Sequence, residues 1–102
     1  MRFLIVSKPK VPVPPDMAET LNDAMAAWFS ENTGNGTIEQ GWAFAGLGGG
    51  GGIANVDSFE ELDELMTSYP FGQVSEVEIF ALTDLGARLE RFKAFFEATA
   101  GG

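Results

Sequence analysis

The sequence contains neither cysteine nor histidine among its 102 residues. The lack of cysteine excludes disulfides, thiolate nucleophiles and thiolate metal sites. The lack of histidine removes the side chain whose ordinary pKa lies nearest neutrality. Acid–base chemistry must therefore be carried by a carboxylate, a lysine, the single tyrosine or water.

Basic residues are also scarce. Six lysines and arginines stand against fifteen aspartates and glutamates, which gives a net charge of −9. Because phosphate binding needs a basic patch, nucleic acid is not expected as a partner. The sequence also lacks an apolar run near the roughly 20 residues of a membrane span and the pattern of a secretory signal. We therefore expect a cytoplasmic protein without a membrane partner, folded as a single domain over residues 1–102.

The stretch from Gly41 to Val56 is the feature around which the rest of the chain is arranged. Trp42 and Phe44 alternate with glycine or alanine, so one face of this predicted strand is almost bare and leaves room for a helix, another backbone or a ligand. The five glycines Gly48–Gly52 lack the Gly-Lys-Ser/Thr ending of a phosphate loop. They predict a flexible hairpin or the rim of a cleft.

Hydrophobic periodicity predicts four strands and three helices. Strands are expected at residues 2–7, 37–45, 53–56 and 74–82. Helices are expected from Asp16, with Glu19 completing a capping box, from Ser58, with Glu61 in the same role, and over about residues 84–98. The order strand, helix, strand, strand, helix, strand predicts an α+β, ferredoxin-like βαββαβ fold with an added C-terminal helix.

Both crossover helices of that fold cover one face of the sheet and leave the other face open. The first predicted strand is nevertheless apolar on both faces, and Phe80 shares a face with Glu76 and Glu78. Exposed apolar faces of that size mark interaction surfaces. We therefore expect a symmetric homodimer in which two sheets stack, with the C-terminal helix sealing an edge or gripping a neighbour.

Several residues together resemble the muconolactone isomerase family of dimeric α+β-barrel proteins. The similarity runs through Phe3, the prolines leading to Met17, Trp42-Ala43-Phe44-Ala45-Gly46 against the family's Trp-Arg-x-x-Gly, then Val56, Ser58, Leu62, Pro70, Val77-Glu78-Ile79 and Leu82. The resemblance implies a dimeric α+β barrel that can assemble into larger rings. It also implies proton transfer between carbons of an unsaturated lactone acid, with no metal and no organic cofactor.

The chain differs from the family pattern at the expected site. Ala43 stands for the family's arginine, Asp63 for a histidine, and Leu4 and Val6 for polar residues of the first strand. An anionic lactone needs a cationic anchor. The differences therefore favour a neutral or larger cyclic substrate.

Three residues are candidates for catalysis. Glu78 matches the family's glutamate on the fourth strand and could shuttle a proton from a dimer cleft, or be a rim carboxylate on a solvated strand end. Glu39 is expected on the bare face beside Gly41 and Ala43, or simply exposed. Lys8 could orient a carbonyl or stabilise an enolate, although such a lysine is more often solvated.

Four residues are candidates for substrate binding: Trp42, Phe80, Tyr69 and Asn55. Trp42 and Tyr69 could line a ligand site or belong to an aromatic core or interface. Asn55 could donate a hydrogen bond to a carbonyl oxygen or satisfy a turn. Phe80 is expected to share a face with Glu78.

Two functions stay open at this point. The first is a cofactor-independent isomerase or cyclase that moves a proton on a small unsaturated lactone or cyclic carbonyl compound. The second is a non-catalytic small-molecule-binding or assembly module of the same fold. In both cases we expect the chain to form a homodimer or a higher oligomer. The first function also requires a small hydrophobic or lactone-like ligand.

Overall fold

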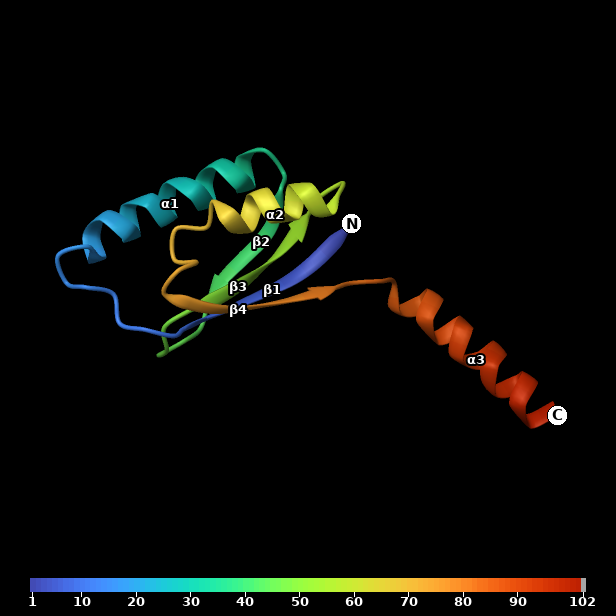
Figure 1. Ribbon diagram of the computed structural model, residues 1–102. Coiled ribbons are helices and arrows are strands. Elements are labelled where there is room, and N and C mark those ends of the chain that lie inside the picture. Colours follow the sequence, from blue (N-terminus) through green and yellow to red (C-terminus); the bar gives the residue numbers. More distant parts are fainter. Residues whose placement is uncertain (102) are drawn as a thin grey trace.

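The computed structural model describes residues 1–101. In chain order the elements are β1 (Arg2–Pro9), α1 (Ala18–Gly34), β2 (Ile38–Ala43), β3 (Gly50–Asn55), α2 (Phe59–Thr67), β4 (Ser75–Ala81) and α3 (Leu85–Gly101). The strands form one antiparallel sheet in the order β2-β3-β1-β4. Helices α1 and α2 cover one face of this sheet (Figure 1). The prediction of a ferredoxin-like α+β fold with an added C-terminal helix is therefore confirmed.

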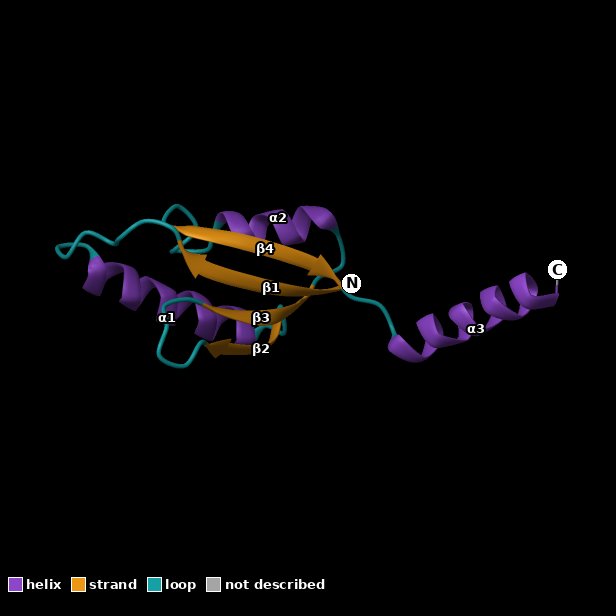
Figure 2. Cartoon of the chain, turned by 90° about the horizontal axis from the view of Figure 1, so that it is seen from below, coloured by secondary structure: helices purple, strands orange, loops and turns teal. Residues whose placement is uncertain are grey.

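The two faces of the sheet are separated by simple alternation along the central strand β1. Phe3 and Ser7 are buried under the helices, whereas Leu4 and Val6 point to the other face because successive side chains of a strand alternate. That second face, the open face, is seen in Figure 2 with α1 and α2 behind the strands. The packed core therefore lies on one side of the sheet only.

The core centres on Ile38 of β2, Ala54 of β3 and Leu65 of α2, all buried. Ile5, Trp28 and Met66 pack against them. These side chains fix the position of both helices over the sheet.

The start of α2 follows the predicted capping box, except that the Glu61 side chain reaches the amide of Asp57, one residue before the capping residue Ser58. Ser58 Oγ accepts a hydrogen bond of 3.1 Å from the Glu61 amide, and Glu61 Oε2 accepts one of 2.8 Å from the amide of Asp57. The corresponding prediction for α1 is wrong, because the capping residue is Met17 instead of Asp16 and its side chain makes no capping hydrogen bond.

The third strand is longer than predicted and includes glycines that the sequence suggested were a turn. Gly50–Gly52 pair with β1 on one side and β2 on the other. A Cβ on Gly51 would lie 2.6 Å from the Ile5 carbonyl oxygen, and one on Gly52 would lie 2.8 Å from that of Gln40. Glycine is required here because the neighbouring backbones leave no room for a side chain.

A β-bulge interrupts β2 at Glu39, where the register shifts between Ile38 and Gln40. Such an extra residue changes which face the side chains take. Glu39 pairs with Arg2, with 2.7 Å between Oε2 and Nη2. The expectation that Glu39 shares the bare face of Gly41 is therefore wrong, since a Cβ on Gly41 would meet Phe29 of α1 under the helices.

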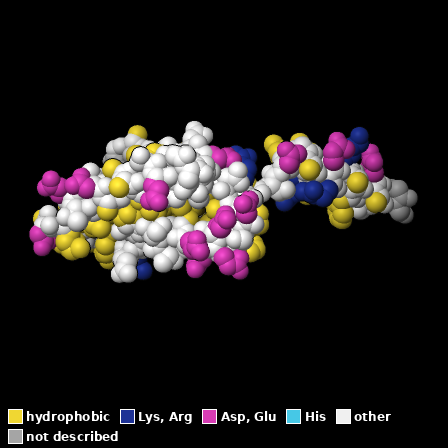
Figure 3. Space-filling model, turned by 90° about the horizontal axis from the view of Figure 1, so that it is seen from above, with side chains coloured by type: hydrophobic (Ala, Val, Ile, Leu, Met, Phe, Trp, Pro, Cys, Tyr) yellow, Lys and Arg dark blue, Asp and Glu magenta, His cyan; other side chains and the backbone are white. Residues whose placement is uncertain are grey.

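Helix α3 projects from the end of β4 away from the rest of the molecule (Figure 1). The radius of gyration is 17.9 Å, compared with about 13 Å for a compact domain of this size. Figure 3 shows α3 as a separate lobe that carries hydrophobic, basic and acidic side chains. Its exposed apolar residues are Leu85, Leu89, Phe92, Phe95 and Phe96. Among the described residues, no helix is long and apolar enough to cross a membrane.

Candidate functional site

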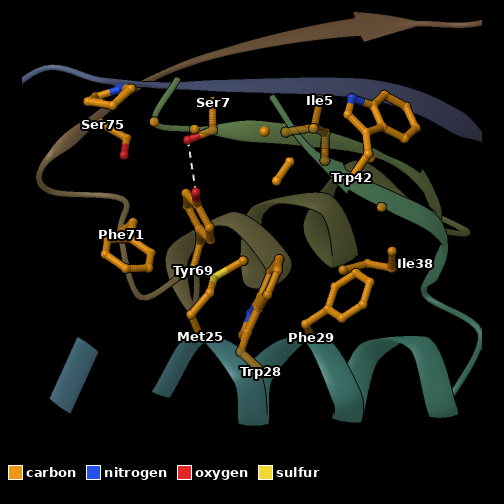
Figure 4. A pocket seen from close by; sticks show the side chains of 18 of the residues that line it. Ile5, Ser7, Met25, Trp28, Phe29, Ile38, Trp42, Tyr69, Phe71 and Ser75 are labelled. Carbon is orange, nitrogen blue, oxygen red and sulfur yellow. Dashed lines mark hydrogen bonds between the residues drawn. The ribbon is translucent and has the colours of Figure 1, made fainter. Parts of the chain in front are cut away.

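A cavity of about 700 Å³ lies between α1 and the helix-covered face of the sheet (Figure 4). This volume falls within the roughly 300–1,000 Å³ of small-molecule sites. Its walls come from β1 and the chain that follows it, from α1, from β2, from the glycine-rich chain 48–52 with the rest of β3, and from the end of α2 with the loop that leads to β4. The lining residues used below are Ile5, Ser7, Met25, Trp28, Tyr69 and Phe71.

One hydrogen-bonded pair of hydroxyls lies across this cavity. Ser7 Oγ and Tyr69 Oη are 2.8 Å apart, and either atom can be the donor. Ser7 comes from the central strand β1 and is only 5% exposed. Tyr69 follows α2 and reaches up to it from the helix layer (Figure 4). The pair therefore joins the sheet to the helix layer inside the cavity.

Aromatic side chains hold Tyr69 in position. The ring of Trp28 lies 5.2 Å from that of Tyr69, measured between centroids, and the ring of Phe71 lies 6.4 Å from it on the same measure. Trp28 Nε1 donates a hydrogen bond of 2.9 Å to Ser68 Oγ, and this hydroxyl donates to the Leu65 carbonyl oxygen. The tyrosine hydroxyl is therefore presented by packed, hydrogen-bonded neighbours.

Within residues 1–101, no charged side chain lines the cavity. Its polar side chains are hydroxyls and an amide, and most of its surface is aliphatic, aromatic or glycine backbone. An ionised ligand loses its hydration in such a place without gaining a counter-charge, which is costly. The arrangement suits a neutral, largely apolar ligand with one or two hydrogen-bonding atoms.

The structure brings one of the predicted binding residues, Tyr69, to the centre of this cavity. Trp42 also borders the cavity from the edge strand β2. It lies opposite Gly51, which pairs with Val6, so its side chain is on the open face. The predicted role of the glycine run as the rim of a cleft is also met, because Gly48–Gly52 form part of the wall.

The other candidates lie elsewhere. Glu78 and Phe80 are opposite Val6 and Leu4 in the β1–β4 register, so they occupy the open face. Lys8 is exposed at the end of β1, opposite Glu76.

Asn55 is exposed at the end of β3 and lines a second hollow with Arg2 and the chain that leads into α3. The structure therefore does not bring Glu78, Glu39 or Lys8 together with Tyr69. A dimer cleft stays the setting in which Glu78 could act.

Sequence reasoning did not single out Ser7. The residue ends an apolar run, and its only signal is a hydroxyl two positions after Ile5, on the same face of a strand predicted to be buried. Met25 and Trp28 of α1 also line the cavity, and Trp28 packs against the core.

Comparison with known proteins finds solved structures with the same fold. No protein-family model and no curated protein sequence matches the chain. Among solved structures, a muconolactone isomerase is similar with a TM-score of 0.75 and 23% identity, over 82% of this chain and 90% of the other. A 5-chloro-2-hydroxyhydroquinone dehydrochlorinase from Burkholderia phenoliruptrix, solved with 2,5-dihydroxybenzoquinone, is similar with a TM-score of 0.59 and 19% identity, over 81% and 94%.

These similarities define the class of fold: the chain has the ferredoxin-like α+β architecture of muconolactone isomerase. At such identities the similarity establishes the fold, and activity has to be argued from the site.

Proposed function

We propose that the protein is a cofactor-independent isomerase or cyclase that moves a proton on a small, neutral, cyclic carbonyl compound. One observation carries this proposal: the apolar cavity holds a hydroxyl pair, and no charged side chain of residues 1–101 lines it. Two enzymes with this fold support an enzymatic role. A carbonyl oxygen of the ligand would accept a hydrogen bond from the pair, which stabilises negative charge that develops there during proton transfer.

Because no charged side chain of the described residues lines the cavity, we expect the substrate to lack the carboxylate of a lactone acid. Muconolactone and its methyl ester form a matched pair, because they share the ring and differ in the carboxylate. We expect the ester to bind at least about tenfold more tightly, a difference of about 1.4 kcal/mol. Titration followed by proton NMR, with tryptophan fluorescence as a second signal, measures both affinities.

Catalysis is tested in the same samples prepared in deuterated water. We expect protein-dependent exchange of the protons next to the carbonyl in the ester or in neutral cyclic enones. Tighter binding or faster exchange of the free acid would contradict the proposal. Exchange that is lost in Glu78→Gln would instead assign the proton transfer to the open face and a dimer cleft.

The second candidate function is a non-catalytic binding module. It is favoured by the lack of a carboxylate or lysine among the described residues of the cavity wall. Binding of neutral rings without any accelerated exchange would identify this function.

We also infer that the open face pairs with a second copy of the chain. Leu4 lies opposite Ile53 on one side and Phe80 on the other, which makes a continuous apolar strip across three strands. Phe80 is 48% exposed in the single chain. Exposed strips of this kind are usually covered by a partner, and stacking two such faces about a two-fold axis would cover both.

A further inference from the structure

The hydrogen bond between the Ser7 and Tyr69 hydroxyls uses only one of their two protons. Ser7 and Tyr69 carry one hydroxyl proton each, and the 2.8 Å bond occupies one of them. Neither hydroxyl has a second hydrogen-bond partner within residues 1–101. One proton is therefore available to a ligand, and the other oxygen of the pair keeps lone pairs that can accept.

The surroundings hold this pair in one arrangement. Ser7 is fixed by the central strand, and Tyr69 is held by Trp28, which is itself hydrogen-bonded to Ser68. A donor and an acceptor that are already positioned need no reorganisation when a ligand arrives. The pair can therefore face two atoms of one ligand at the same time.

We propose that Ser7 and Tyr69 act as a two-hydroxyl proton relay. This inference rests on the proposed function and names its substrate class: neutral ring ketones whose α-proton is further activated by an adjacent aromatic ring or second carbonyl group. That activation is required because a serine hydroxyl is a weak base. The cavity wall of aromatic side chains and bare glycine backbone suits a flat ring of this kind.

The step conserves atoms and charge. The substrate C–H bond breaks as its proton passes to Ser7 Oγ, and the electron pair forms a carbon–carbon double bond. The carbonyl π electrons move to oxygen, which takes the Tyr69 proton, while the original Ser7 proton passes to Tyr69 Oη. Both hydroxyls end as they began, and the ketone has become its enol. Re-protonation of the same carbon by the reverse route exchanges its proton. Where the enol is conjugated to a further carbon–carbon double bond, re-protonation at the far end of that system completes an isomerisation.

The test uses 2-tetralone, a neutral fused-ring ketone whose C1 proton is activated by both the carbonyl and the aromatic ring. Loss of the C1 proton signal in deuterated water measures exchange, and tryptophan fluorescence measures binding. We expect wild-type protein to accelerate exchange. Tyr69→Phe and Ser7→Ala should each lower the acceleration by about 100-fold or more. Affinity should fall by no more than about tenfold, since one neutral hydrogen bond is lost.

The controls separate this relay from simpler explanations. Ser30→Ala, on the exposed side of α1, should change neither exchange nor binding. Tyr69→Phe keeps the ring, so circular dichroism should show a folded protein even if Ser7→Ala is unstable. Binding of 2-tetralone without accelerated exchange, or acceleration that survives Tyr69→Phe, would overturn the relay and leave the binding site standing. No binding of any neutral ring would overturn the proposed function as well.

Discussion

The two faces of the sheet differ in what covers them and in the side chains they present. The helix-covered face carries the packed core and a cavity whose polar side chains are hydroxyls and an amide. The open face carries an apolar strip, and next to it the charged residue Glu78. Lys8 lies on the same face at the end of β1. The carboxylates that the sequence offers for catalysis therefore lie on the face opposite the cavity.

This difference assigns ligand binding to the covered face and favours association of two copies through the open face. A ligand in the cavity meets hydroxyl groups and aromatic rings, so neutral chemistry is favoured there. A surface that is apolar at its centre and charged around it suits association of two copies. Substitutions on one face that have a matched control on the other test this difference between the faces.

The largest effect is expected from Leu65→Ala on the covered face. Leu65 is 4% exposed in the core, and removing such a side chain costs about 2–5 kcal/mol of unfolding free energy. Leu4→Ala on the open face is the matched control. Its cost should be smaller and should grow with protein concentration if a partner covers Leu4. Urea unfolding at two concentrations measures both, and equal, concentration-independent costs would contradict the assignment of the faces.

The next effect concerns association through the open face. Leu4→Glu places a charge in the centre of the apolar strip and should raise the dimer dissociation constant by about 100-fold, near 2.8 kcal/mol. Leu47→Glu is the control, because Leu47 is 76% exposed in the loop between β2 and β3. Sedimentation equilibrium distinguishes the two variants. If the Leu4→Glu protein stays dimeric, the interface is not on the open face. The exposed side of α3 would then be the next surface to test.

The sequence predicted the architecture because its signals are local. Alternation in β4 places Val77 and Ile79 on one face and Glu78 and Phe80 on the other, as the register with β1 confirms. Ser58 with Glu61 is a capping box whose partners lie within one helical turn. Periodicity and capping depend on neighbouring residues, so a single sequence is enough to find them.

The site was harder to predict because it depends on long-range packing. Glu39 was placed on the wrong face because a single bulge in β2 changes the alternation, and no residue type marks that bulge. Gly50–Gly52 suggested a turn, and their strand conformation follows from neighbouring strands whose backbones exclude a Cβ. Tyr69 was a candidate from its chemistry alone. Its partner Ser7 is 62 residues away in the chain, so the pair appears only after folding.

A smaller effect is expected at the helix layer that makes the two faces different. Ser58→Ala removes the side-chain acceptor of the Glu61 amide at the start of α2 and should cost about 1 kcal/mol. Ser30→Ala is the matched control on the exposed side of α1. Thermal unfolding by circular dichroism measures both. Because Tyr69 follows α2, loss of ligand affinity in Ser58→Ala beyond the change in stability would show that the cap also positions the cavity.

The smallest effect is expected at the ion pair between Arg2 and Glu39. Arg2 Nε and Nη2 both donate to the Glu39 carboxylate, but the pair is solvent-exposed, so Glu39→Gln should cost no more than about 1 kcal/mol. The cost should disappear in about 1 M salt, where the screening length is near 3 Å. Glu31→Gln, exposed on α1, is the control. Because the bulge turns Glu39 away from the cavity, exchange of 2-tetralone protons should be unchanged. Loss of that exchange in Glu39→Gln would place a carboxylate in the reaction and remove the distinction between the two faces.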